Sequence, residues 1–327
     1  MDALASGAGI SGLNGHTSPC RFTYLCVKEP HEAADLVVVL SHLGFPQDFR
    51  LAGEVQGIDV LLSGHTHNRM ERPAWVNGTP IIQSGCHGSF VGRLDIQLRE
   101  GKVTVCGHEL VALDDSIPAD PDVKALVDDA LTPHRSMLGE VVGHTRNGLH
   151  RNTMLQASMD DLLLAAIADA AGTELAFSNG WRYGAPVPPG PITMADLWDI
   201  IPGNPPVSVV ELTGAELVEM MEENLERTFA ADPFEQMGGF VKRCRGLQLY
   251  AKLENPAGHR IDRLFVGGEP VQPGDSRTAA FVTAQGVPAK FGRHRRDLDV
   301  RAVDALRGWV AGRDFADPEF VPSVIAV

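Results

Sequence analysis

Two short apolar runs, each ending in a small residue and a histidine, most strongly constrain how this chain can fold. The first is Asp-Leu-Val-Val-Val-Leu-Ser-His at 35–42, and the second is Gly-Ile-Asp-Val-Leu-Leu-Ser-Gly-His-Thr-His at 57–67. Continuous runs of valine and leucine of this length are typical of buried parallel strands. Since the carboxyl ends of parallel strands meet at one edge of a sheet, we expect His42, His65 and His67 to converge there.

Converging imidazoles at such an edge indicate a metal site. A neutral imidazole binds divalent ions well, and the His-x-His spacing lets two rings reach one metal or two neighbouring metals. Gly64 allows a tight backbone turn beneath them. Three histidines are too few for a two-metal hydrolase, which also needs bridging carboxylates. The alternative is that His42, His65 and His67 are ordinary polar loop residues.

Size and charge exclude several classes of protein. The 327 residues allow two domains of ordinary size, and no apolar run is long enough to span a bilayer. A net charge of −14 argues against a partner bound through a nucleic-acid backbone, although it permits a small anionic substrate held by metals and a few arginines. We therefore expect a small anionic substrate, no nucleic acid and no membrane.

The N-terminus and the cysteines bear on the compartment. The first residues have no basic start and no sustained apolar core, so we expect no secretory signal, which favours the cytoplasm, or the periplasm if a segment lies upstream. The cysteines at 20, 26, 86, 106 and 244 are odd in number and widely spaced, and we expect them to be mostly reduced and structural.

The chain is predicted to consist of a first domain at 1–113, a connector helix at 114–139 and a second domain at 140–327. The connector contains a helix from Pro121 to Leu138 with Asp120 as its N-cap and a kink at Pro133. In the first domain, a strand is expected at 79–83 and a hairpin at 93–110, where two alternating runs flank a turn.

The second domain alternates helical and strand patterns, which predicts a mixed α/β or α+β fold. Helices are expected to begin at Ser158, with a start like a capping box, and at Thr193 and Thr213. A further helix is expected near the C-terminus. The expected strands lie at 174–177, 247–253, 260–266 and 278–283.

Two loops of this domain are candidates for binding substrate. In the first, Asn179 and Gly180 can form a turn that exposes backbone donors, and the planar guanidinium of Arg182 can hold an anion. The alternative for Arg182 is a structural ion pair. The second loop contains Gln236, followed by Gly238, Gly239 and Arg243.

These motifs resemble a known superfamily. Ser41-His42, the strand at 58–62 and Gly64-His65-Thr66-His67 are similar to the last two metal-binding blocks of the calcineurin-like metallophosphoesterases. Within that superfamily the chain resembles the 5′-nucleotidase group, including the thiosulfohydrolase of sulfur oxidation. The marks of the second half are Ser178–Gly184, Pro-Gly-Pro-Ile-Thr at 189–193, Glu-Leu-Thr-Gly at 211–214 and Gln-Met-Gly-Gly at 236–239.

The resemblance implies a fold and a reaction. The fold is part of a metallophosphoesterase domain of the β-sandwich type, followed by a mixed α/β domain of the 5′-nucleotidase C-terminal type. The reaction is metal-dependent hydrolysis of phosphate esters, as in nucleotide catabolism, or of related sulfur esters. Two divalent ions such as Mn or Zn would polarise the substrate oxygens, with His42 and His65 on one ion and His67 on the other. Arg182 would act catalytically by neutralising the substrate.

The resemblance also implies substrate contacts. Asn179 and Arg182 fall on an Asn-Gly-Gly-x-Arg type of segment that nucleotidases use to bind substrate. Phe291 would take one position of an aromatic clamp on the base. The segment matching the other clamp position, Ile-Pro-Gly-Asn-Pro-Pro at 201–206, has no aromatic residue, which weakens the nucleotide hypothesis in favour of the thiosulfohydrolase branch.

The family's Asp-x-His, second Asp and Asn-His-Asp or Asn-His-Glu blocks do not occur ahead of Asp35. Asn14-Gly15-His16 has only a superficial likeness to the last of them. We therefore expect one metal or none, weak metal binding and little turnover. Two alternatives follow: an inactive module that binds an anion or a protein, or half of an enzyme completed by a separate N-terminal polypeptide.

Overall fold

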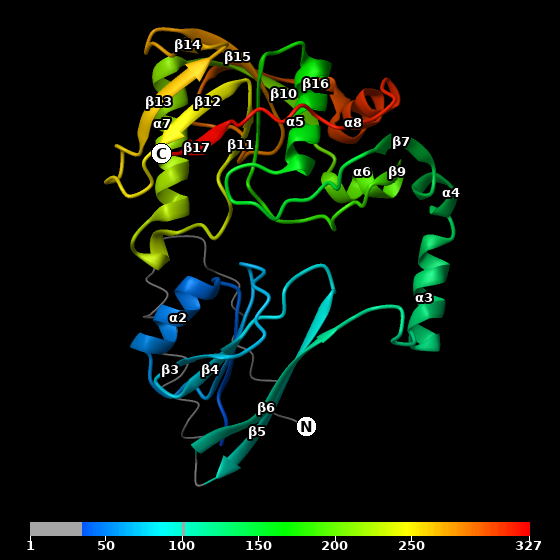
Figure 1. The fold of residues 1–327 in the computed structure, drawn as a ribbon, viewed down its shortest axis with the longest axis vertical. Coiled ribbons are helices and arrows are strands. Elements are labelled where there is room, and N and C mark those ends of the chain that lie inside the picture. The colour runs from blue at the N-terminus through cyan, green and yellow to red at the C-terminus, as the bar shows by residue number, and fades with distance from the viewer. Residues whose placement is uncertain (1–34, 100–101) are drawn as a thin grey trace. The chain divides into compact units, whose positions relative to one another are not determined.

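The computed structural model describes residues 35–99 and 102–327, and the chain forms two compact units, Met1–Asp114 and Asp115–Val327 (Figure 1). His16, Cys20 and Cys26 lie outside the described residues. Cys244 is a buried free thiol in the second unit.

The first unit contains a four-stranded sheet. In the order in which they pair, its strands are β1 (Val38–Ser41), β2 (Val60–Ser63), β4 (Thr79–Ile82) and β3 (Ala74–Val76). The pairing of β1 with β2 is parallel, in the register Val38↔Val60 to Ser41↔Ser63, which confirms the arrangement predicted from the two apolar runs. Helix α2 (Phe45–Glu54) packs Leu51 and Ala52 against Leu61 and Ile81 of the sheet.

Strand β1 is less buried than its apolar sequence predicts. Within the described residues it is an edge strand, and the side chain of Leu40 is 74% exposed. In contrast, Val60 and Leu61 of the inner strand β2 are almost completely buried. The prediction of a buried strand therefore holds for β2 and is wrong for β1 in this part of the chain.

A long hairpin follows the sheet. Strands β5 (Phe90–Arg99) and β6 (Lys102–Ala112) pair in antiparallel register, which confirms the predicted hairpin and extends it at both ends. The second unit then opens with α3 (Pro121–Leu131) and α4 (Arg135–Leu138). The single helix predicted from Pro121 to Leu138 is therefore broken, and not only kinked, at Pro133. The carboxylate of Asp120 caps α3 by accepting hydrogen bonds from the backbone N–H groups of Asp122 and Val123.

The strands of the second unit form two sheets and a short antiparallel pair. The pair consists of β7 (Val141–Thr145) and β9 (Gly190–Thr193). The five-stranded sheet has the order β11 (Arg243–Arg245), β8 (Leu175–Ser178), β15 (Ser276–Phe281), β10 (Pro206–Thr213) and β16 (Arg293–Arg301). The four-stranded sheet has the order β14 (Glu269–Pro270), β13 (Ile261–Val266), β12 (Leu247–Ala251) and β17 (Val324–Ala326).

The five-stranded sheet separates two hydrophobic cores. Ala176 faces a core shared with helices α5 (Ser158–Ala171), α6 (Met194–Ile200) and α8 (Ala302–Ala311). Its neighbours Leu175 and Phe177 face a second core, which is shared with α7 (Gly214–Phe229) and the four-stranded sheet. Because successive side chains of a strand point to opposite faces, this alternation shows that both faces of the sheet are covered.

Local sequence signals determine several helix ends. Thr193 and Thr213 each form a capping box, with Asp196 and Glu216 respectively, as predicted. The predicted cap at Ser158 is wrong, because α5 begins after Ala157 without a side-chain cap. The Ser158 hydroxyl instead accepts a hydrogen bond from the His150 N–H and donates one to the Gly148 carbonyl.

The architecture is the predicted mixed α/β fold. Its helices and sheets alternate along the second unit, and Figure 1 shows α5, α6 and α8 apart from α7 within that unit. Among the described residues, no helix combines the length and the apolar composition that crossing a bilayer requires.

The capping box of α7 gives a first prediction. Replacing Thr213 with Ala removes the hydroxyl that accepts from the Glu216 N–H, and we expect the free energy of unfolding to fall by about 1 kcal/mol. Urea denaturation measures this loss. Glu219→Ala, at an exposed position of the same helix, is the control and should change stability by less than about 0.5 kcal/mol. Equal effects of the two substitutions would contradict the capping role.

Candidate functional site

His42 and His65 lie together at the carboxyl edge of the first unit's sheet. His42 follows β1 and His65 follows β2, and the parallel register of these strands brings their ends side by side. The Nε2 atom of His42 is 3.2 Å from the Nδ1 atom of His65, and the ring centroids are 4.9 Å apart. A Cβ atom added at Gly64 would lie 3.2 Å from the Nδ1 atom of His42, which is closer than an ordinary van der Waals contact. The absence of a side chain at Gly64 therefore lets the His42 ring pack against this turn.

A buried carboxylate supports this pair of strand ends. Asp48 of α2 is completely buried and accepts hydrogen bonds from the hydroxyls of Ser41 (2.5 Å) and Ser63 (2.6 Å). Burial raises the pKa of Asp48, while the two hydroxyls and the charges of His42 and His65 act in the opposite direction. A carboxylate thus ties together the last residues of β1 and β2, directly before the two histidine-bearing segments.

Sequence reasoning did not single out Asp48 or Gln83. The side-chain amide of Gln83 donates to the Ser63 hydroxyl (3.0 Å) and accepts from the hydroxyl of Thr66 (3.1 Å). Gln83 therefore fixes the turn between His65 and His67. An acid in the first turn of a helix and an amide at the end of a strand give no local signal of such a role.

His67 lies beside a different histidine. Its ring centroid is 6.2 Å from that of His87, and the Nδ1 atom of His87 is 3.3 Å from the sulfur of Cys86. The backbone φ angles of His65, His67 and His87 are 65°, 58° and 58°. Such left-handed conformations are costly for residues other than glycine and cluster at functional sites.

The described residues fit part of a metal site. His42 and His65 could supply two imidazole ligands to one divalent ion. Within residues 35–99 and 102–327, however, no group of three or more histidine, cysteine, aspartate or glutamate side chains is placed to hold a metal. The metal role of His42, His65 and His67 therefore stays a prediction.

The two candidate substrate loops of the second unit lie side by side. Strand β8 leads into Ser178–Gly184, and β11, which pairs with β8 in the register Arg243↔Ser178, follows the segment at 236–242. The Phe240 N–H donates to the Gly180 carbonyl at 2.9 Å. A Cβ atom on residue 180 would lie 2.2 Å from the Phe240 carbonyl oxygen, so only glycine permits this approach.

Asn179 shapes the first loop. Its side chain is 4% exposed, accepts a hydrogen bond from the Trp181 N–H (2.9 Å) and donates one to the Thr283 hydroxyl (3.2 Å). The guanidinium of Arg182 lies over the ring of Phe240 at 4.8 Å from its centroid, which links the two loops. The substrate contacts predicted for Asn179, Gly180 and Arg182 stay predictions.

The structure does not support two of the predicted substrate contacts. Arg243 is 2% exposed; it pairs with Asp160 at 2.9 Å and donates to the carbonyls of Thr153 and Met154. Phe291 is 3% exposed and packs into the core around α7. In the structure both side chains have structural roles, because the Arg243 guanidinium is buried against Asp160 and two carbonyls and the Phe291 ring is enclosed by the core.

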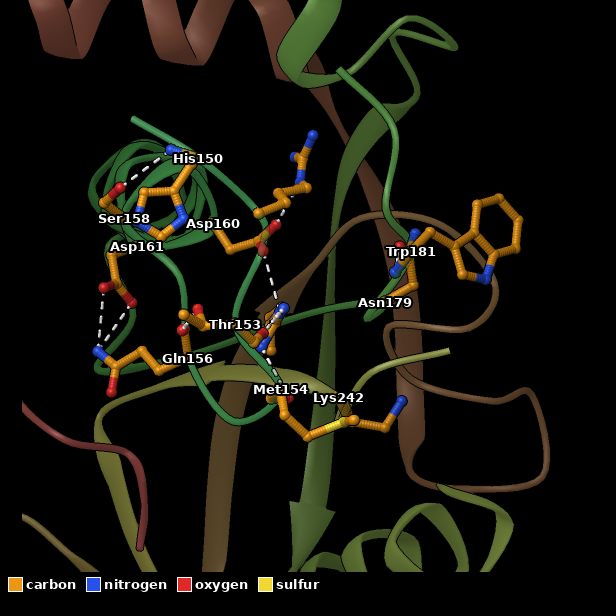
Figure 2. A network of polar contacts seen from close by, with 12 residues as sticks. His150, Thr153, Met154, Gln156, Ser158, Asp160, Asp161, Asn179, Trp181 and Lys242 are labelled. Atoms are coloured by element: carbon orange, nitrogen blue, oxygen red, sulfur yellow. Dashed lines mark hydrogen bonds and ion pairs between the residues drawn. The ribbon is translucent and has the colours of Figure 1, made fainter. Parts of the chain in front are cut away.

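Figure 2 shows the network around Asp160. The carboxylate of Asp160 pairs with Arg243 and also with Arg151 at 2.8 Å, and all three side chains are buried. Arg151 further donates to the carbonyls of Tyr183 and Ile200. Sequence reasoning missed this network, because nothing local predicts that Asp160 pairs with an arginine 83 residues later.

A pocket of about 230 Å³ lies where the loops meet. Gly239 lines the pocket, and Gly238 adopts a left-handed conformation beside it with φ of 71°. The other lining residues are Asn179, Gly180, Trp181, Met220, Glu223, Asn224, Arg227, Met237, Phe240, Lys242, Ala284, Gln285, Pro288 and Lys290. This pocket combines cationic, aromatic and thioether side chains.

Comparison with known proteins gives a consistent result. Residues 141–280 match the model of the 5′-nucleotidase C-terminal domain family. The chain is 27% identical over 247 residues to the trifunctional nucleotide phosphoesterase protein YfkN of Bacillus subtilis (strain 168), covering 71% of this chain and 16% of YfkN. It is 22% identical over 266 residues to human 5′-nucleotidase, covering 70% of this chain and 45% of that protein. The chain thus spans less than half the length of these two relatives.

Solved structures extend the likeness beyond the C-terminal domain. Sulfate thiohydrolase SoxB of Thermus thermophilus superposes with a TM-score of 0.85 at 27% identity, covering 95% of this chain and 58% of SoxB. A 5′-nucleotidase precursor from Thermus thermophilus superposes with a TM-score of 0.80 at 19% identity, covering 95% of this chain and 68% of the precursor, which shows a common fold.

The fold is a mixed α/β fold that the chain shares with solved structures of a sulfate thiohydrolase and a 5′-nucleotidase precursor. Residues 141–280 match the 5′-nucleotidase C-terminal domain family, and the chain is similar to nucleotide phosphoesterases, as the sequence motifs predicted.

The close approach of the two loops gives a second prediction. Replacing Gly180 with Ala places a methyl group against the backbone oxygens of Phe240 and Val241, and we expect a loss of about 2 kcal/mol or more in the free energy of unfolding. Urea denaturation is the measurement. Gly203→Ala has open space around the new methyl group and should be nearly neutral. If Gly180→Ala left the free energy of unfolding unchanged, the close approach of the two loops would not be required for stability.

A third prediction concerns pH. Burial raises the pKa of Asp161 to about 6, and the neighbouring charge of Asp160 adds to this effect, while the Gln156 amide opposes it by donating to both carboxyl oxygens. The folded-state pKa lies above the unfolded value. The carboxyl therefore stabilises the fold most below about pH 4, and this contribution is lost as the pH rises through about 6.

We expect the stability of the wild type relative to Asp161→Asn to fall by about 1.5 kcal/mol between pH 5 and pH 7.5. Urea denaturation of both proteins at each pH tests this difference. Asp169→Asn, at an exposed position of the same helix, is the matched control for the change of side chain. A pH-independent difference for Asp161→Asn would contradict the assignment.

Proposed function

We propose that this protein is a metal-dependent hydrolase of phosphate esters or related sulfur esters, which uses His42 and His65 as metal ligands. The observation that carries the proposal is the approach of these two rings to 3.2 Å at the carboxyl edge of a parallel strand pair. This is the edge at which open α/β sheets place their ligands. A divalent ion held there would polarise a phosphoryl or sulfonyl oxygen.

The loop of the second unit that bears Arg182 has the chemistry to bind an anionic ester. Arg182 carries a permanent positive charge on a planar fork of N–H donors, a shape that matches phosphate and sulfonate oxygens. Its packing over Phe240 helps to orient the guanidinium. We assign to Arg182 the role of balancing the substrate's negative charge, and to Asn179 and Gly180 the shaping of the loop that presents it.

Both substrate classes agree with the relatives. YfkN is named a nucleotide phosphoesterase, whereas SoxB is named a sulfate thiohydrolase. The burial of Phe291 removes one aromatic face that a nucleotide base would need. For this reason we propose sulfur esters and nucleotides as equally supported substrate classes.

One observation favours a second function, the binding of an anion without turnover. Across the described residues, no metal-ligating group larger than the His42–His65 pair is assembled. A chain with two imidazole ligands would bind a divalent ion weakly and would still keep the arginine-bearing loop. In that case the second unit would be the functional part.

Metal binding by the purified chain gives a fourth prediction. Titration calorimetry with Mn²⁺ or Zn²⁺ should detect weak binding, and His42→Ala and His65→Ala should each lower the affinity about tenfold or more, because each removes one imidazole ligand. His134→Ala, at an exposed position in the second unit, is the control and should bind like the wild type. Unchanged affinity in both site variants would overturn the metal assignment.

Hydrolysis separates the two functions. The same preparations are assayed with nucleoside monophosphates and with a thiosulfate ester, with and without added metal. Metal-dependent turnover that is lost in His42→Ala supports the hydrolase. Metal binding with no turnover of either substrate supports the binding module instead.

A further inference from the structure

A second cavity of the second unit lies at the opposite end of β8 from the two candidate substrate loops. Its volume is about 440 Å³. The lining includes Glu174, which directly precedes β8, and Arg245, the last residue of β11. The turn at 267–268 between β13 and β14 and part of the segment at 319–323 complete it. The proposed hydrolysis uses none of these residues.

Close backbone contacts fix the walls of this cavity. Gly246 has a φ angle of 82°, and a Cβ atom there would lie 2.2 Å from the carbonyl oxygen of Glu174. A Cβ atom at Gly267 would lie 3.0 Å from Oε1 of Glu174. The side chain of Gln156 holds the segment at 321–323 by donating to one of its carbonyls and accepting from one of its N–H groups, both at 3.0 Å. The cavity is therefore a defined part of the fold.

Arg245 brings a half-buried positive charge to the cavity. It lies two residues after Arg243 in β11, so the two side chains share a face of the strand. Arg243 pairs with Asp160, whereas no ion pair joins Arg245 to a carboxylate in the described part of the chain. Burial raises the pKa of Asp161, while the charges of Arg243 and Arg245 act in the opposite direction. Arg245 thus lies near Asp161 without pairing with it.

Two exposed carboxylates, Glu174 and Glu319, line the same cavity. Neither forms an ion pair with another of the described residues. Together with Asp161, whose carboxylate accepts from the Gln156 amide (Figure 2), they surround one guanidinium with three acidic groups. Unpaired charges of both signs in one cavity favour a ligand that itself carries both signs, because each of its charges then finds a partner.

Phe265 and Val321 give the cavity an apolar side. The ring of Phe265 is half-buried and packs edge to face against Tyr250, with the ring centroids 6.0 Å apart. Val321 is 46% exposed. Both side chains are therefore accessible, as are the charged groups of Glu174, Glu319 and Arg245. This accessibility distinguishes the cavity from the buried surroundings of Asp160.

We propose that this cavity binds a free α-amino acid with an apolar side chain. The carboxylate of the ligand pairs with the planar guanidinium of Arg245, and its ammonium group pairs with Glu174 and Glu319. The side chain of the ligand lies against Phe265 and Val321. The site goes beyond the proposed hydrolysis, because it needs no metal and no turnover. The competing explanation is that the lining charges are only solvated and the cavity holds water.

Titration calorimetry on the full chain near neutral pH distinguishes these explanations. The probe is L-phenylalanine, and two analogues keep its ring: phenethylamine lacks the carboxylate, and 3-phenylpropanoate lacks the ammonium group. We expect L-phenylalanine to bind at least tenfold more tightly than either analogue, because only the amino acid satisfies charges of both signs. Equal binding of either analogue, or no binding of L-phenylalanine and of L-leucine as a second apolar amino acid, would overturn the proposal.

Arg245→Met should lower the affinity for L-phenylalanine to that of phenethylamine, because the carboxylate of the ligand loses its partner. Arg277→Met is the matched control: Arg277 is a half-buried arginine of β15 that lies outside the lining of the cavity, so its loss should leave the affinity unchanged. A folded Arg245→Met variant that binds L-phenylalanine as tightly as the wild type would refute the site.

A second variant keeps the test decisive if Arg245→Met does not fold. The double variant Glu174→Gln with Glu319→Gln changes two exposed side chains to amides of the same shape and leaves Arg245 in place. We expect it to bind L-phenylalanine and 3-phenylpropanoate alike, because the partners of the ammonium group are gone. A preference for L-phenylalanine as large as that of the wild type would contradict the proposal. These outcomes do not depend on hydrolysis, so they can fail separately from the proposed function.

Discussion

One buried carboxylate organises the second unit. Asp160 lies between two buried arginines, Arg151 and Arg243, and forms an ion pair with each. The arginines in turn donate hydrogen bonds to the carbonyls of the loop at 153–154, of Tyr183 and of Ile200, which holds these segments in place. Buried ion pairs add little net stability, because desolvation offsets their attraction. Their effect here is positional: a single charge fixes the start of α5, the end of α6 and the edge strand β11 relative to the loop that bears Arg182.

Short-range signals in the sequence predicted much of the fold. The caps at Asp120, Thr193 and Thr213 depend on residues within one helical turn, and alternation within a strand depends on its neighbours. Ser158 shows the limit of such signals. Its hydroxyl had the residue type and position of a cap, but the backbone of the segment at 148–150 competes for it, and that segment approaches only in the folded chain.

Some features of the candidate site could likewise be predicted from local sequence, and others depend on contacts that form only in the folded chain. The meeting of His42 and His65 could be predicted, because parallel pairing of two recognisable strands requires it. The burial of Arg243 and Phe291 could not, since it depends on which distant side chains surround them. Arg245 went unnoticed because a lone arginine in sequence normally lies in water. Only the nearby Asp161 and the walls of the cavity reveal its unusual position.

The five-stranded sheet has a consequence for how such a protein can diversify. Both of its faces are sealed by hydrophobic cores, so a small molecule can approach this sheet only at the tips of its strands. Selection for a new substrate would therefore act on the segments that link strands to helices, where insertions and charge changes cost little. The strands themselves would drift only among apolar residues of similar volume, and proteins with this scaffold would differ chiefly at its rim.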